Sequence, residues 1–135
     1  MDFKIYRSGI ANNNLVLEKA SATVIEAGDL VALDAGGLAI KAIAASTAVA
    51  FAEAGAGDGE TTITVNNDST LILSGTAGTN FAKANRGAEV DISGTTTQLI
   101  NLAASVTDVL KVLPSENAGT VGATTEVLVK INKPL

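Results

Sequence analysis

Glycine interrupts this chain of 135 residues at short intervals, and those interruptions constrain its fold more than any other feature. Between the glycines lie short runs rich in valine, isoleucine, leucine and threonine, the residue types that suit strands. Runs this short leave little room for long helices. The pattern therefore predicts an all-β fold, mainly strands with at most one or two short helices, arranged as a barrel or a sandwich.

The clearest local pattern is a hairpin in the first third of the chain. Gly28-Asp29 predicts a turn, Leu30–Leu33 a strand, Asp34–Gly37 a second turn, and Leu38–Ile43 the returning strand. Glycine at the turn positions adopts positive φ without strain from a Cβ atom. The hairpin is therefore predicted from residue chemistry as well as from hydrophobicity.

Other strand patterns recur along the chain, at 15–17, 22–25, 61–65, 71–73, 88–92, 98–102, 109–113 and 125–131. The alanine-rich stretch Ala44–Ala56 is ambiguous, because its propensity favours a helix while Thr47–Phe51 fits a strand equally well. Asn80–Arg86 is the best candidate for a short helix, since Gly87 follows it at the position where helices commonly end.

The first fourteen residues are predicted to form an extended N-terminal arm, 1–14, attached to a single β-rich domain, 15–135. Three asparagines end this segment and favour a turn. Its aromatic side chains pack either on the same subunit or on a neighbour, and the alternative to an arm is an ordinary first strand. The candidate contact residues are its large apolar side chains, Phe3, Ile5, Tyr6 and Ile10.

The chain contains no histidine and no cysteine. The sequence therefore offers no imidazole base, no Ser-His or Cys-His pair, no thiolate or imidazole metal site, and no disulfide. Nine basic residues against a net charge of −5 make a poor nucleic-acid binder. We expect a protein that is not an enzyme and that has no catalytic residues, cofactor, metal or nucleic-acid partner.

Two weaker signals point to chemistry, and each has a simpler interpretation. The Gly55–Gly59 stretch lacks the spacing of a phosphate-binding loop and precedes a strand rather than a helix, so a surface turn is expected. Three acidic residues near it are conceivable Ca²⁺ ligands but match no calcium-binding pattern, namely Asp58, Glu60 and Asp68.

The acidic residues that could supply paired carboxylates for catalysis are scattered along the sequence, namely Glu53, Asp58, Glu89 and Asp91. The most hydrophobic charge-free run, Ala42–Ala52, is too short to span a bilayer, so no membrane association is expected. The features that remain are architectural, and they favour a binding or building unit.

Several of these runs, taken in order, resemble a known family, namely Gly28–Asp34, Gly36-Gly37, Leu38–Ala42, Glu53–Gly59, Thr61–Val65, Gly87–Ile92, Leu99–Ala104 and Val127–Asn132. The pattern resembles the capsid decoration (cement) proteins of tailed bacteriophages and is broadly similar to the head decoration protein of phage lambda. The resemblance extends from about Ala22 to Leu135.

The resemblance implies a small β-barrel or β-tulip-like domain, usually trimeric, on the outer surface of the virion. Such a protein is made in the host cytoplasm and stabilises an expanded capsid by bridging subunits of the major capsid protein. The candidate contact residues of the arm would then meet the capsid or a sister subunit. Another β-rich virion module, such as a head fibre or a host-attachment domain, is the alternative.

Overall fold

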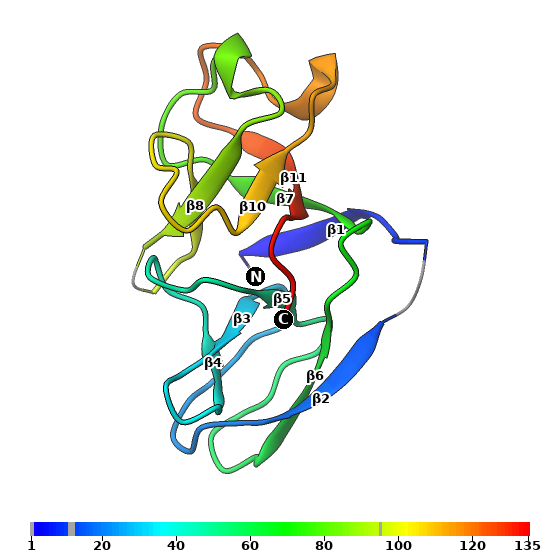
Figure 1. The fold of residues 1–135 in the computed structure, drawn as a ribbon, viewed down its shortest axis with the longest axis vertical. Coiled ribbons are helices and arrows are strands. Elements are labelled where there is room, and N and C mark those ends of the chain that lie inside the picture. Colours follow the sequence, from blue (N-terminus) through cyan, green and yellow to red (C-terminus); the bar gives the residue numbers. More distant parts are fainter. Residues whose placement is uncertain (1, 11–12, 95) are drawn as a thin grey trace.

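The computed structural model describes residues 2–10, 13–94 and 96–135 (Figure 1). Its elements are eleven strands and two short 3-10 helices within those ranges. In chain order they are β1 (Phe3–Arg7), β2 (Asn14–Glu18), β3 (Leu30–Leu33), β4 (Ala39–Lys41), β5 (Ala50–Phe51), β6 (Thr62–Asn66), β7 (Ile72–Thr76), η1 (Lys83–Asn85), β8 (Glu89–Ser93), β9 (Leu99–Asn101), β10 (Leu110–Val112), η2 (Glu116–Ala118) and β11 (Glu126–Ile131).

The strands form two antiparallel sheets, which confirms the predicted all-β fold. One sheet has six strands in the order β1-β7-β11-β10-β8-β9, and the other has five in the order β2-β6-β5-β3-β4. Figure 1 shows the six-stranded sheet in the upper half of the molecule and the five-stranded sheet in the lower half. The chain crosses between them from β1 to β2 and again from β6 to β7.

The barrel suggested by the sequence is not closed. The end strands of the five-stranded sheet, and β9 and the end of β7 in the six-stranded sheet, are joined by isolated single-residue bridges in place of paired strands. Lys19, just after β2, bridges to Ala39 in β4, and Ala77, just after β7, bridges to Ile100 in β9. Both bridges are parallel, in sheets whose strand pairs are otherwise antiparallel.

The predicted hairpin is confirmed as β3 and β4. Leu33 pairs with Ala39, and the Asp34 N–H donates to the Leu38 carbonyl oxygen at 2.9 Å. The Asp34 carboxylate accepts the N–H groups of Gly36 and Leu38 inside the turn, at 2.9 and 3.0 Å. Gly37 adopts a φ of +82°, as the turn chemistry required.

Two local predictions changed in detail, and one alternative that the sequence left open is resolved. Residues 22–25 form a turn and an isolated bridge at Ile25 rather than a strand, and Ala22 has a φ of 58°. The alanine-rich stretch forms the two-residue strand β5 and no helix. The predicted short helix is present only as η1, where the Asn85 side chain accepts the Ala82 N–H at 2.7 Å.

Two hydrophobic clusters meet at strand β3. Leu30 and Ala32 belong to a main core that also contains most of the buried hydrophobic residues of the six-stranded sheet. Val31 belongs to a second core, which is lined by the curled five-stranded sheet and includes Ile63 and Val65. Successive residues of a strand point to opposite faces, so β3 is buried on both of its faces.

Candidate contact surface

Phe3 lies in the core of its own chain. It stands opposite Gly75 where β1 pairs with β7, and its side chain is 1% exposed. A Cβ atom placed on Gly75 would lie 2.3 Å from the Phe3 ring, so the ring occupies the space that the missing side chain leaves. Phe3 is therefore not available to a partner, although the sequence placed it among the candidate contacts.

The other three candidate contacts are exposed large hydrophobic residues. Ile5 is 39% exposed, Tyr6 57% and Ile10 93%. The register of β1 against β7 shifts between Ile5 and Arg7, at an irregularity in the strand. The segment 3–7 is therefore an ordinary first strand, the alternative that the sequence left open, and it carries exposed apolar side chains.

The link after β1 is held against the turn between β6 and β7. The Ile10 N–H donates to the Thr70 hydroxyl at 2.8 Å, and that hydroxyl donates to the Asp68 carboxylate at 2.7 Å. A Cβ atom on Gly9 would lie 2.0 Å from the same carboxylate, so only glycine fits this close approach. These contacts fix the backbone at Ile10 while its side chain projects into solvent.

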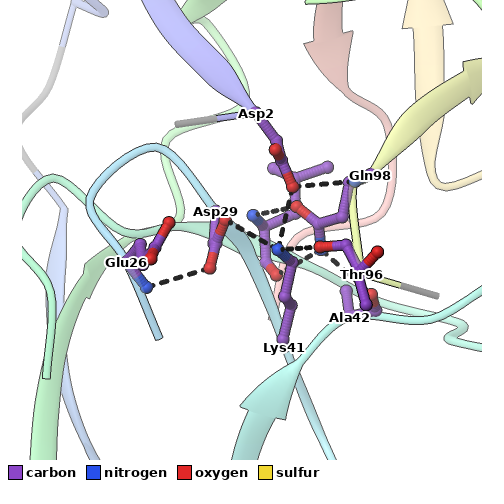
Figure 2. Close-up of polar contacts among 8 residues, drawn as sticks. Asp2, Glu26, Asp29, Lys41, Ala42, Thr96 and Gln98 are labelled. Atoms are coloured by element: carbon purple, nitrogen blue, oxygen red, sulfur yellow. Dashed lines mark hydrogen bonds and ion pairs between the residues drawn. The ribbon is translucent and has the colours of Figure 1, made fainter. Parts of the chain in front are cut away.

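A polar junction joins the start of the chain to both sheets (Figure 2). We define it by Asp2, Asp29, Lys41, Thr96 and Gln98. The Lys41 ammonium donates to the Thr96 carbonyl oxygen at 2.6 Å and forms ion pairs with the carboxylates of Asp2 at 2.9 Å and Asp29 at 3.3 Å. The ammonium therefore lies between two carboxylates and one carbonyl oxygen.

Gln98 contributes the buried amide of this junction. Its side chain, 2% exposed, exchanges two hydrogen bonds with the backbone of Leu30 and donates a third to the Ala42 carbonyl oxygen at 2.9 Å. The Gln98 backbone N–H donates to Asp2 at 2.7 Å. The loop before β9 is thereby fastened to β3, to the residue after β4 and to the N-terminal segment.

The charges of the junction shift the Lys41 pKa upward. Burial of the ammonium lowers its pKa, but the hydrogen bond to Asp2 and the charge of Asp29 together outweigh burial. The pKa of Lys41 is therefore raised above its ordinary value. The arrangement stabilises a cation between two carboxylates, which is a structural role rather than the lowered pKa of a nucleophilic lysine.

Asp91 organises a second polar site, which the sequence listed only as a scattered carboxylate. Its side chain, 5% exposed, accepts the backbone N–H groups of Val106, Thr107 and Asp108 at 2.8 to 3.1 Å. Burial raises the Asp91 pKa, but these backbone hydrogen bonds outweigh it, so the pKa is lowered. The carboxylate thus holds the loop 104–108 in one conformation.

The remaining acidic residues are not brought together as a site. Asp58 and Glu60 are exposed on the glycine-rich loop, whereas Asp68 is buried in the β6–β7 turn. Glu53 and Glu89 are also exposed. Among the residues that the structure describes, no three His, Cys, Asp or Glu side chains form a group able to hold a metal ion.

Comparison of the chain with protein families, with curated proteins and with solved structures finds no match. Within the described ranges, no helix has the length and apolar character needed to cross a membrane.

Proposed function

We propose that this chain is a structural virion protein, without a catalytic role, that decorates an expanded phage capsid. It binds the outer surface and bridges subunits of the major capsid protein as a homotrimer. The resemblance of its ordered strand pattern to capsid decoration proteins motivates the proposal. The observation that carries it is the exposure of Ile5, Tyr6 and Ile10 within one short segment.

Exposed apolar side chains on a fixed backbone favour association with another protein. Tyr6 and Ile10 leave most of their apolar surface in water, while the backbone around them is held by β7 and by Thr70. Fully burying one such side chain contributes on the order of 1.5–3 kcal/mol. Because little backbone is left to order, this burial is not offset by the entropy of ordering a flexible arm, and only the loss of free translation and rotation opposes it.

Stabilisation of the capsid follows from binding one state of the lattice. A protein that binds the expanded lattice but not its disrupted form stabilises it by RT ln(1 + [L]/Kd) at every site. The effect is multiplied over many sites on one shell. This mechanism needs a rigid body and a contact surface, and it needs no cofactor, nucleic acid or membrane.

Purified protein mixed with expanded, undecorated phage heads tests the proposal. We expect the protein to sediment with the heads and to raise the temperature at which they disrupt. Ile10→Asp should abolish co-sedimentation, because it places a charge in the contact. Val24→Asp is the matched control, since Val24 is 53% exposed in a different loop, and it should bind normally.

Failure of the wild-type protein to bind any expanded head would overturn the proposal. Binding to host cells together with no binding to heads would favour the host-attachment module among the alternatives. Equal loss of binding in the Ile10 and Val24 variants would show that the N-terminal segment is not the contact.

A further inference from the structure

We propose that the outer face of the six-stranded sheet binds an acidic segment of a partner protein through three cationic side chains. We call Arg7, Lys111 and Lys130 the cationic row. The inference rests on the proposed function for the identity of the partner, a capsid subunit. It adds the chemistry that this partner presents to the sheet.

The cationic row crosses four neighbouring strands. Arg7 in β1 pairs with Ile72 in β7, and Ile72 pairs with Lys130 in β11. Lys130 pairs in turn with Lys111 in β10. Residues directly opposite each other in an antiparallel sheet have their side chains on the same face. Neighbouring strands lie about 4.8 Å apart, so the strands that carry the row span about 14 Å.

The row faces away from the main core. Residues that flank Lys111 and Lys130 along their strands are buried in that core, so both lysines point to the opposite face. These flanking residues are Leu110, Val112, Val129 and Ile131. Arg7 and Lys111 are exposed, and Lys130 is half-buried. A partner that lies on this face can therefore reach all three charges.

The three cations lack an acidic partner within their own chain. Among the residues that the structure describes, neither an ion pair nor a hydrogen bond occupies any of their charged groups. Glu89 in β8 pairs with Lys111 along the backbone, yet their side chains form no ion pair. Lys4 and Lys41, by contrast, are both paired with acids. Contacts within the fold therefore do not explain the alignment of the row.

The pairing of Lys130 with Lys111 costs the free protein stability. Like charges directly opposite each other on neighbouring strands repel. A carboxylate placed over the two ammonium groups attracts both of them and offsets their repulsion. Binding of an acidic segment would therefore relieve a repulsion that the free chain carries.

The surroundings of the row favour a short acidic peptide over a nucleic acid. Glu89 stands at the β8 end of the row, and Glu126 lies on the same face in an ion pair with Lys4. A nucleic acid continues as a line of phosphates, which these acids would repel. Three acids at alternate positions of an extended segment span about 13 Å, a length comparable to the row. The row also adjoins Tyr6, which belongs to the proposed capsid contact.

Titration of the isotope-labelled free protein with a hexaglutamate peptide, followed by NMR, tests the inference without capsids. We expect chemical shift changes confined to the surroundings of the row, and none with a hexaglutamine peptide. The affinity should fall as the salt concentration rises from about 0.01 to about 1 M, because the Debye length shortens from about 30 to about 3 Å.

Lys111→Glu should weaken binding of the hexaglutamate peptide roughly fivefold or more, because it replaces an attraction with a repulsion. Lys83→Glu is the matched control, since Lys83 is an exposed lysine in η1, away from the row. This control makes the same change in net charge and should bind the peptide as the wild type does.

Lys130→Glu separates recognition from folding. It should weaken peptide binding and also raise the melting temperature of the free protein by about 2–5 °C, because an attraction replaces the repulsion between β11 and β10. An unchanged or lowered melting temperature would overturn the inference.

Absent peptide binding, or binding that Lys111→Glu leaves intact, would also overturn the inference. Equal or tighter binding of a six-residue oligothymidylate would exclude a protein partner in favour of phosphate. Phage heads that bind the wild type and Lys111→Glu equally would leave the decoration role standing without the acidic partner. Lysine-dependent peptide binding together with no binding to any head would instead overturn the decoration role alone.

Discussion

The side chain of Gln98 bonds to the backbone of Leu30 as a neighbouring strand would. Its Oε1 accepts the Leu30 N–H at 2.8 Å, and its Nε2 donates to the Leu30 carbonyl oxygen at 2.8 Å. Leu30 is fully buried, so water cannot replace these bonds. The Leu30 carbonyl oxygen also accepts the Ala42 N–H at 2.8 Å, so the amide is the partner of the Leu30 N–H and a second donor to its carbonyl oxygen.

Replacing Gln98 with leucine should destabilise the protein by about 3 kcal/mol, because the buried Leu30 N–H and the Ala42 carbonyl oxygen would lose the Gln98 amide as their partner. Urea unfolding followed by circular dichroism measures the change. Thr97→Ser, at an exposed neighbour, is the control and should be nearly neutral. A loss below about 1 kcal/mol for Gln98→Leu would contradict the assigned role.

Gly75→Ala should destabilise the protein by about 1–3 kcal/mol, because the added Cβ overlaps the Phe3 ring. The double variant Gly75→Ala/Phe3→Ala should lose less stability than the sum of the losses of the two single variants, since the overlap is absent once the ring is removed. Gly57→Ala is the control, because its Cβ would meet nothing closer than 3.9 Å. Strict additivity measured by urea unfolding would refute the contact.

Asp91 should make stability fall in acid. Its pKa is lower in the folded state, so its contribution is present above the unfolded pKa, about 3.9, and is lost as pH falls through the folded value. Unfolding free energies measured from pH 6 downward should therefore fall more steeply for the wild type than for Asp91→Asn. Equal slopes of unfolding free energy against pH for the wild type and Asp91→Asn would contradict this role of Asp91. Asp58→Asn, at an exposed acid, should retain the wild-type slope.

Lys41 should make the stability of the protein fall at alkaline pH. Its pKa is higher in the folded state, so its contribution is present below the unfolded pKa, about 10.4, and is lost as pH rises through the folded value. Lys41→Met should destabilise the protein by about 3 kcal/mol at neutral pH, since Asp29 then keeps a buried charge without its cation. The difference from wild type should shrink above the folded pKa, and a constant difference would exclude this explanation.

The sequence predicts best where the determining chemistry is local. The β3–β4 turn was predictable because Asp34 and Gly37 act within the turn itself. The sequence offered Asp91 only as one of several scattered acids, yet the loop 104–108 donates its backbone N–H groups to this carboxylate, which is buried. Gln98 gave no local signal, since its partner Leu30 lies 68 residues away in sequence.

The candidate contact residues show the same difference between local and long-range determinants. The sequence singled out the apolar side chains of the N-terminal segment, and three of the four are exposed. It could not separate Phe3 from the others, because the distinction depends on Gly75, which reaches Phe3 only through sheet pairing. The fastened loop that carries Val106 depends in the same way on a distant acid, Asp91.

Burial of β3 on both faces has a mechanical consequence. A load applied to the six-stranded sheet passes through Leu30 into the same strand whose Val31 anchors the five-stranded sheet. Neither sheet can unfold while the other still packs against β3. A molecule stretched by force should therefore unfold in one step rather than two.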